Sequence, residues 1–331
     1  MSSLKDVAKL ANVSMMTVSR AINAPEQLRA DTLQRVQIAI KELNYVPDLS
    51  AKKVRGARAT PNAIGVLALD TVTTPFSVDI ALAIEETARA HGWHSFVINM
   101  FENDNVDDIM NLLLSHRPAG VIFTTMGLRH VKVPKQLRPW ACVLANCESS
   151  DVQLPSYIPN DHKGQYEGTI ALLEAGYRQP LCLHLPELRV ASHRRRSGLE
   201  QACREKNIDP DTFIHLYMAS GDEHYRDIPA MVLANMKEGK PLFDSVICGN
   251  DRMAFMVYQT LLSQGIRIPQ DVAVLGYDNM VGIGDLFLPP LSTIQLPHYE
   301  IGSLSALHII NGSSHCDTIK VNSPLLLRSS L

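Results

Sequence analysis

The sequence predicts an α/β protein with an N-terminal helix-turn-helix headpiece and two doubly wound, mostly parallel sheets, each at the centre of one subdomain. Two patterns carry this prediction. Residues 4–20 have the spacing of two short helices joined by a tight turn, and beyond residue 60 apolar runs of strand length alternate with helical stretches. The 331 residues also exceed the usual size of one domain, which favours more than one folding unit.

Three helices are predicted to form the headpiece, residues 1–47. A serine at position 2 or 3 can cap the first helix, and Ser14 can cap the second, residues 15–22. Asn12 falls in the turn, where a positive φ is needed and asparagine is tolerated better than most residues. A third helix is expected over residues 30–43. The apolar residues at helical spacing are Leu4, Val7, Ala8, Ala11, Leu33, Val36, Ile40 and Leu43.

The N-terminal part of the chain is basic. Through Ala59 there are ten Lys and Arg against five Asp and Glu, a net charge of +5, so the total of −3 leaves −8 for the remainder. A basic arm on a mildly acidic body is typical of nucleic-acid-binding proteins. Short helix-turn-helix patterns also occur in ordinary helical hairpins. The position and charge of this one favour a headpiece that presents its second helix to the DNA major groove.

A hinge and linker are predicted over residues 48–60. Pro47 breaks the preceding structure, Asp48 can cap one or two helical turns, and Gly56 can end them. So short and basic a helix is marginal by itself, and it could form when two copies meet on DNA. A flexible linker is the alternative, and the two readings agree if the segment orders on binding.

The body after residue 60 is predicted to hold two series of strands and helices. Its apolar runs lack polar alternation, as expected for strands covered on both faces. The first series comprises strands at 64–69, 96–98, 120–123 and 142–145, with helices at 77–91 and 106–116. The second comprises strands at 181–185, 213–216, 245–248, 272–276 and 325–328, with helices at 164–175, 195–206, 225–237 and 253–264. Such sheets bind ligands outside the carboxyl ends of their strands.

Residues 4–56 resemble the headpiece and hinge of the lactose repressor family. The resemblance rests on a short basic helix and on three preceding stretches, Val13-Ser14, Thr17-Val18-Ser19-Arg20 and Asn44-Tyr45-Val46-Pro47. It then continues through the whole chain. It implies a body like the periplasmic sugar-binding proteins, with an effector cleft between two subdomains.

The same resemblance implies how the body is divided. The chain is expected to cross between the subdomains three times, near 158–159, 289–291 and 321. The first subdomain then holds about residues 61–158 with 292–320, and the second holds 159–291 with 321–331.

The resemblance also implies which residues contact DNA. Met15 and Met16 occupy the family's principal base-reading pair, and methionine, which lacks a strong donor, would read shape and the thymine methyl group. The alternative is that one of them packs inward. Val54 takes the place of a minor-groove wedge that is usually leucine. The expected DNA-binding residues are Ser14, Met15, Met16, Thr17, Ser19, Arg20, Asn23, Tyr45, Ser50, Lys53 and Val54.

Polar and aromatic residues near the predicted strand ends suit a sugar, which needs planar polar groups for its hydroxyls and a flat apolar surface for its C–H face. Asp251 is expected to cap the helix that follows it. Asn146 departs from the acid common there in the lactose repressor. Turn-forming residues and a solvated run at Arg194–Arg196 are the alternatives. Through the resemblance, the expected effector-binding residues are Phe76, Asn146, Arg195, Tyr225, Asn250, Asp278 and His298.

These features predict a DNA-binding repressor of a sugar-utilisation operon that a sugar inducer releases from its operator. Sucrose or one of its products is favoured, because five stretches are similar to family members that control sucrose use. They are residues 15–17, 45–51, 74–80, 124–130 and 287–291. A same-family regulator that responds to fructose, a phosphosugar or another small metabolite is the alternative, since Arg194–Arg196 lies near the cleft.

The expected partners are a pseudopalindromic operator and a second copy of the chain, because one headpiece contacts too few base pairs for specificity. The last strand is followed by no heptad segment, which favours a dimer over a tetramer. No enzymatic activity or cofactor is expected, because the sequence lacks hydrolase and Walker motifs. No metal is expected, because the 6 Cys and 12 His do not have the spacing of metal ligands. Without a signal peptide or membrane-length apolar stretch, the chain is expected to be cytoplasmic, reduced and free of the membrane.

Overall fold

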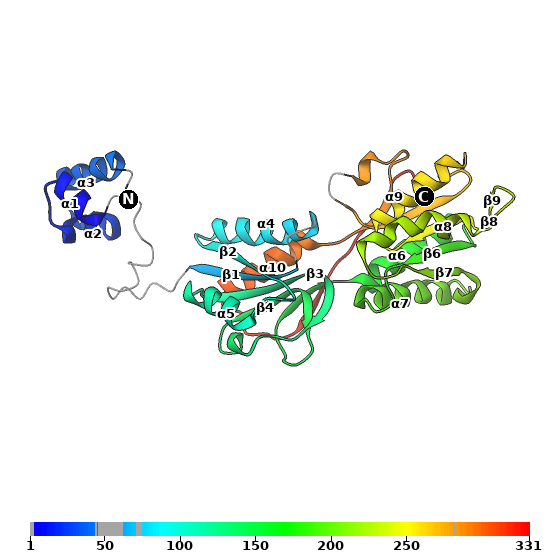
Figure 1. Cartoon of the computed structure of the whole chain (residues 1–331), viewed down its shortest axis with the longest axis horizontal. Coiled ribbons are helices and arrows are strands. Elements are labelled where there is room, and N and C mark those ends of the chain that lie inside the picture. Colours follow the sequence, from blue (N-terminus) through cyan, green and yellow to red (C-terminus); the bar gives the residue numbers. More distant parts are fainter. Residues whose placement is uncertain (1–2, 44, 46–61, 71–74, 281–282) are drawn as a thin grey trace. The chain divides into compact units, whose positions relative to one another are not determined.

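A computed structural model describes residues 3–43, 45, 62–70, 75–280 and 283–331 (Figure 1). The chain divides into two compact units, Met1–Thr60 and Pro61–Leu331. The predicted hinge and linker, residues 48–60, lie outside the described residues.

The smaller unit is a three-helix headpiece. Its helices are α1 (Leu4–Leu10), α2 (Met15–Asn23) and α3 (Ala30–Glu42), with a 3₁₀ turn at Pro25–Gln27. Ser3 forms a capping box with Asp6 on α1, and Ser14 caps α2. Asn12 has a φ of 52°, which confirms the prediction for the turn. The buried core of the headpiece comprises Val7, Ala8, Ala11, Val18, Val36 and Ala39.

The larger unit holds two six-stranded sheets. The strands of the first are β1 (Ala63–Leu69), β2 (His94–Met100), β3 (Gly120–Val131), β4 (Cys142–Ser149), β5 (Ser156–Pro159) and β13 (Thr318–Val321). They lie in the order β13-β5-β4-β3-β1-β2, with parallel pairing throughout. Helices α4 (Pro75–Ala90) and α10 (His298–Ile310) cover one face, and α5 (Val106–Ser115) covers the other.

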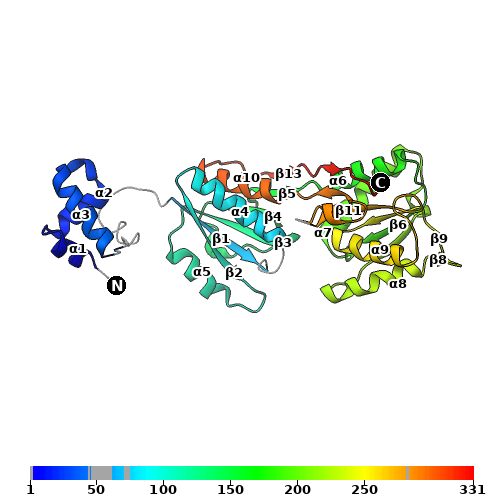
Figure 2. The same ribbon diagram turned by 90° about the horizontal axis from the view of Figure 1, so that it is seen from above.

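The strands of the second sheet are β6 (Pro180–His184), β7 (Ile214–Tyr217), β10 (Ser245–Cys248), β11 (Ala273–Asp278), β12 (Ser292–Gln295) and β14 (Leu325–Leu326). Their order is β14-β12-β11-β10-β6-β7, and only the β12–β14 pair is antiparallel among these described strands. Helices α6 (Asp161–Glu174) and α7 (Val190–Glu205) cover one face, and α8 (Ile228–Leu233) and α9 (Asp251–Ser263) cover the other (Figure 2).

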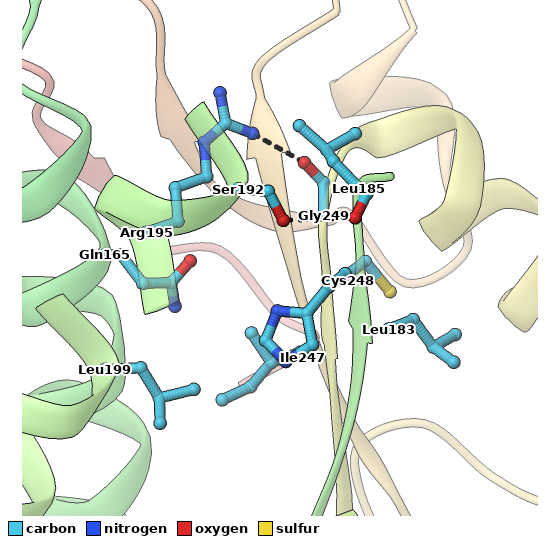
Figure 3. A pocket seen from close by; sticks show the side chains of 10 residues that line it. Gln165, Leu183, Leu185, Ser192, Arg195, Leu199, Ile247, Cys248 and Gly249 are labelled. Atoms are coloured by element: carbon cyan, nitrogen blue, oxygen red, sulfur yellow. Dashed lines mark hydrogen bonds between the residues drawn. The ribbon is translucent and has the colours of Figure 1, made fainter. Parts of the chain in front are cut away.

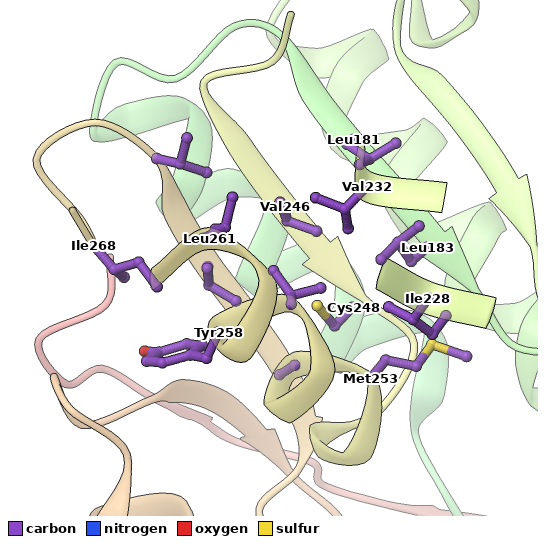
Figure 4. Close-up of a cluster of buried hydrophobic side chains, with 14 of the residues drawn as sticks. Leu181, Leu183, Ile228, Val232, Val246, Cys248, Met253, Tyr258, Leu261 and Ile268 are labelled. Carbon is purple, nitrogen blue, oxygen red and sulfur yellow. The ribbon is translucent and has the colours of Figure 1, made fainter. Parts of the chain in front are cut away.

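Apolar side chains fill both faces of each sheet, which explains why the strands read as continuous apolar runs. The largest cluster lies between the second sheet and the helices α8 and α9, and Val246, Cys248 and Leu261 are among its buried members (Figure 4). Among the described residues, no helix combines the length and the apolar character needed to cross a membrane. The predicted α/β class with two parallel sheets is confirmed.

One predicted crossing between the subdomains is misplaced. Residues 289–291 do not lead into the first subdomain, because β12, which follows them, pairs with β11 of the second sheet. The chain leaves that sheet only after Gln295 and enters α10 at His298. The consecutive prolines mark a turn into a short buried strand, and the sequence pattern does not separate such a turn from a crossing.

Two predicted helices differ in extent. The helix expected at 225–237 is divided into a 3₁₀ segment, Asp222–Asp227, the short helix α8 and a hairpin of β8 (Met236–Lys237) and β9 (Lys240–Pro241). Glu238 and Gly239, both with positive φ, form the turn of that hairpin. Helix α7 begins at Val190, five residues before the expected start.

Candidate functional site

Helix α2 exposes side chains that the sequence predicts to meet DNA. Met15 and Met16 are 53 % and 67 % exposed, whereas Val18 of the same helix is fully buried. Neither methionine belongs to the headpiece core, so the alternative of inward packing does not hold. Arg20 is also exposed. The helix therefore presents two flexible apolar side chains and one cation to the solvent.

Other expected DNA contacts have local structural roles. The Ser14 Oγ lies 2.9 Å from the Thr17 Oγ1 and accepts the Thr17 N–H at 3.1 Å, so both residues hold the start of α2. Ser19 is half-buried. Tyr45 packs against the headpiece core, and its N–H donates to the Ile40 carbonyl at 3.0 Å. The side chain of Asn23 and all of Ser50, Lys53 and Val54 lie outside the described part of the chain.

In the larger unit, Arg195 of α7 has the most fully defined surroundings. Its buried guanidinium donates from Nε to Asp161 Oδ1 at 2.7 Å. It also donates from Nη1 to the Gly249 carbonyl at 2.6 Å (Figure 3). The guanidinium carbon lies 3.5 Å from the centre of the Tyr277 ring. Sequence reasoning missed Asp161 and Tyr277, because these partners are 34 and 82 residues away along the chain. Together they hold the cation in one orientation.

A close approach of α6 and α7 makes this ion pair possible. A Cβ at Gly198 of α7 would lie 2.1 Å from the carbonyl oxygen of His162 on α6, so no larger residue fits there. Asn160 caps α6, and Asp161 is the first residue of that helix. The glycine thus lets the start of α6 reach the Arg195 side chain.

Asp278 at the end of β11 has the features of a ligand-binding carboxyl group. It is buried, its φ of 104° is rare for a residue with a side chain, and its Oδ1 has no hydrogen-bond partner in the described structure. Burial, with the negative charge of Asp251 second, raises the pKa of Asp278 well above its usual range. Backbone strain and an unpaired buried oxygen are typical of functional sites, where a ligand hydroxyl can complete the hydrogen bonding.

Asp251 does not cap α9, so that prediction is wrong. The cap is Asn250, whose Oδ1 accepts a backbone N–H of the helix at 2.9 Å and whose Nδ2 donates to the Tyr225 hydroxyl at 2.6 Å. Asp251 is buried instead, and it accepts the Thr293 hydroxyl at 2.7 Å and the Met280 N–H at 2.9 Å. Two adjacent residues with similar capping preference cannot be ranked from sequence alone.

The structure brings together four expected effector residues of the second subdomain and His298, the first residue of α10, which covers the first sheet. The charge of Arg195 acts on both Asp278 and His298, and that of Asp278 acts on Tyr225, which Asn250 contacts. The described members of this effector cluster are Arg195, Tyr225, Asn250, Asp278 and His298.

Asn146 and Phe76 belong to elements of the first subdomain. The sequence predicts that Asn146 follows a strand ending at residue 145. It lies instead within β4, with a φ of 60° beside a register irregularity. Its Nδ2 donates to the Thr125 carbonyl at 3.2 Å, and its Oδ1 is buried without a described partner. The side chain of Phe76 lies outside the described residues.

The run Arg194–Arg196 is only partly exposed, with side chains that are 25 %, 8 % and 20 % exposed. Arg194 pairs with Glu148 of β4, Arg195 pairs with Asp161, and the Arg196 Nε lies 2.7 Å from Glu200 Oε1. Each guanidinium therefore already has a carboxylate partner. The first of these pairs joins α7 to the first sheet.

Two cavities lie near these residues. One, of about 240 Å³, is next to two of the crossing segments and is lined by Pro159, Asn160, Asp161, His162, His193, Arg194, Ser197 and Lys320. The other, of about 10 Å³, has room for roughly one water molecule and lies between α6, α7 and the second sheet (Figure 3). Arg195 lines the smaller cavity, together with Gln165, His184, Ser192 and Gly249.

We expect stability to fall in mild acid because of His298. Burial, with the charge of Arg195 second, lowers its pKa from 6.5 to about 4. The unfolded chain takes up this proton near pH 6.5 and the folded chain does not, so the stabilisation present above pH 6.5 is lost as the pH falls toward 4. The slope is about 1.4 kcal/mol per pH unit for this one group.

Denaturant unfolding of the wild type and His298→Gln at about pH 6.5 and about pH 5 measures this effect. The wild type should lose about 2 kcal/mol more than the variant, because every other titrating group is common to both. An equal loss in the two proteins would show that His298 is not held neutral by its surroundings.

Two family models match this chain. Residues 61–328 match the model described as periplasmic binding proteins and sugar binding domain of LacI family, and residues 3–48 match bacterial regulatory proteins, lacI family. Over 330 residues the chain is 56 % identical to the sucrose operon repressor of Escherichia coli, with 100 % of both chains covered.

Solved structures share the fold. The Lac repressor bound to ONPG in its repressed state superposes with a TM-score of 0.82 at 24 % identity, covering 100 % of this chain and 99 % of that one. A putative LacI-family regulator from Rhizobium etli gives a TM-score of 0.73 at 26 % identity, covering 82 % and 99 %.

Proposed function

Because the chain belongs to the lacI family of bacterial regulatory proteins, we propose that it represses a sucrose-utilisation operon and leaves its operator when a sugar binds at the effector cluster. The relatives described above are regulators and not enzymes. The observation that carries the proposal is that one chain combines an exposed α2 surface with a largely buried cluster of polar side chains, in which Asp278 Oδ1 is an unpaired acceptor.

The effector cluster favours a neutral sugar over a phosphosugar. The three arginines of the run Arg194–Arg196 are each paired with a carboxylate, and Arg195 is further held by a carbonyl and a ring. Arg194 keeps one buried donor, its Nη1, without a partner among the described residues. A phosphate needs several donors and would have to displace one of these carboxylates to gain more of them, which is unfavourable. Hydroxyl groups can instead donate to the unpaired oxygens of Asp278 and Asn146, which are acceptors for neutral donors.

The larger unit also carries exposed apolar side chains that suit a second copy of the chain. Val78 and Leu82, one helical turn apart on α4, are 60 % and 45 % exposed. Phe255 and Leu262, two turns apart on α9, are 48 % and 47 % exposed. Apolar side chains paired in this way on a helix face are typical of subunit interfaces. A symmetric dimer places two headpieces on the two halves of a pseudopalindromic operator.

Calorimetric titration of the purified full-length protein tests the sugar class. We expect saturable binding of sucrose or of one of its products, fructose or glucose, and no heat of binding from the corresponding phosphates at the same concentrations. If only a phosphorylated sugar binds, the neutral-sugar proposal is wrong. If none of these ligands binds, the effector is not of this class.

A further inference from the structure

Two histidines interrupt the apolar interior of the second sheet. His184 on β6 and His215 on β7 lie on the sheet face that α6 and α7 cover, and Cys182 pairs in register with His215. β6 is an inner strand and β7 is the edge strand of this sheet, and strands of parallel sheets are apolar on both faces in most proteins. A stacked pair of imidazoles, buried at His184 and half-buried at His215, therefore calls for a chemical reason.

The hydrogen bonds fix the form of both rings. The His215 Nε2 lies 2.9 Å from the Pro210 carbonyl oxygen, and because a carbonyl only accepts, the proton is on this Nε2. The His215 Nδ1 then carries a lone pair and accepts from the His184 Nε2 at 2.8 Å. Burial lowers the pKa of both rings, that of His184 to about 3, so both are neutral. A neutral imidazole oriented by a carbonyl is the form that binds metal ions.

The Cys182 thiol completes a set of three ligands. Its Sγ and one nitrogen of each histidine all lie within 4.8 Å of one another. Two metal–nitrogen bonds of about 2.0 Å in a trigonal site place their nitrogens roughly 3.5 Å apart, so the rings need to separate by less than about 1 Å. His184 lines the cavity of about 10 Å³, so free space adjoins its ring.

We propose that Cys182, His184 and His215 form a binding site for Cu⁺. Thiolate and imidazole are the ligands that this soft ion prefers, and three of them satisfy it. On binding, a Cu–S bond replaces the S–H bond of Cys182 and one proton leaves to solvent, while the His184 proton moves from Nε2 to Nδ1. The occupied site is then neutral. Zn²⁺ would leave a buried charge of +1 within electrostatic reach of Arg196, and the described residues supply three ligands where Zn²⁺ prefers four.

Anaerobic titration of the full-length protein with Cu⁺ against a chromogenic Cu⁺ chelator tests this site. We expect one ion per chain to be taken from the chelator, with release of one proton, and X-ray absorption to show two nitrogen ligands and one sulfur ligand. Cys182→Ala should weaken binding by more than about 100-fold, and His215→Gln, whose amide can still donate to the Pro210 carbonyl, should weaken it similarly.

Cys142→Ala is the matched control, because Cys142 is also buried but lies on the first sheet. It should bind Cu⁺ like the wild type, and circular dichroism should show the same folded content in all variants. No uptake by the wild type, or equal uptake by Cys182→Ala, would overturn the proposal. Tighter binding of Zn²⁺ than of Cu⁺ would overturn the choice of ion.

Discussion

Arg195→Ala should abolish the response to sugar while the folded protein keeps its affinity for operator DNA. The substitution removes a cation that Asp161, Gly249 and Tyr277 hold in the effector cluster. It also leaves the Asp161 carboxylate, which is fully buried on α6, without its partner. Loss of one member of such a buried pair lowers the free energy of unfolding by about 3–5 kcal/mol.

Two further variants separate the loss of binding from the loss of stability. Arg195→Met combined with Asp161→Leu removes both charges, so much of the stability should return while the sugar response stays absent. Arg196→Ala is the matched control, because Arg196 contacts Glu200 and Asp211 and no residue of the effector cluster. Fluorescence anisotropy titration of operator DNA, with and without sugar, compares Arg195→Ala, the double variant and the control. A normal sugar response in Arg195→Met/Asp161→Leu would show that the cluster is not the effector site.

Replacing Met15 and Met16 together should change which operator the protein prefers. Both side chains are exposed, so Met15→Gln with Met16→Gln should leave the melting temperature nearly unchanged. Amide side chains make bidentate contacts with adenine that methionine cannot make, and each such contact is worth about 1–3 kcal/mol of discrimination. Selection from a randomised operator pool measures the preference. Val18→Ala, at a fully buried position of the same helix, is the contrast, since it should lower stability without redirecting preference. An unchanged preference in the double variant would contradict base reading by α2.

Local chemistry made much of the fold predictable. The caps at Ser3 and Ser14, the positive φ of Asn12 and the apolar strands follow from rules that act over a few residues. Features that depend on distant partners did not follow. The place of β12 is set by its pairing with β11. The start of α7 at Val190 could not be predicted from apolar residues at helical spacing, because residues 189–196 are mostly polar.

At the site, too, features set by local sequence could be predicted and features set by distant partners could not. Arg195 and Asp278 could be predicted from their position after strands and from the family resemblance. The resemblance did not predict the residues that hold the buried charges, which are Asp161 for Arg195 and Thr293 for Asp251. The partner of a buried charge is chosen by tertiary packing, here by the contact that Gly198 permits between two helices. The paired histidines of β6 and β7 were invisible in the sequence for the same reason, since 31 residues separate them.

The central claim is that sugar and operator bind to one protein and oppose each other. Thermodynamic linkage requires each ligand to weaken the other by the same factor, and couplings of about 1–3 kcal/mol, roughly 5- to 150-fold, are typical. The direct measurement is the dissociation constant of the sugar that calorimetry identifies, determined with free protein and with protein saturated by its operator at one salt concentration. We expect the sugar to bind operator-bound protein at least about fivefold more weakly, and operator DNA to bind sugar-saturated protein more weakly by the same factor. Equal sugar affinity for free and operator-bound protein would contradict the account.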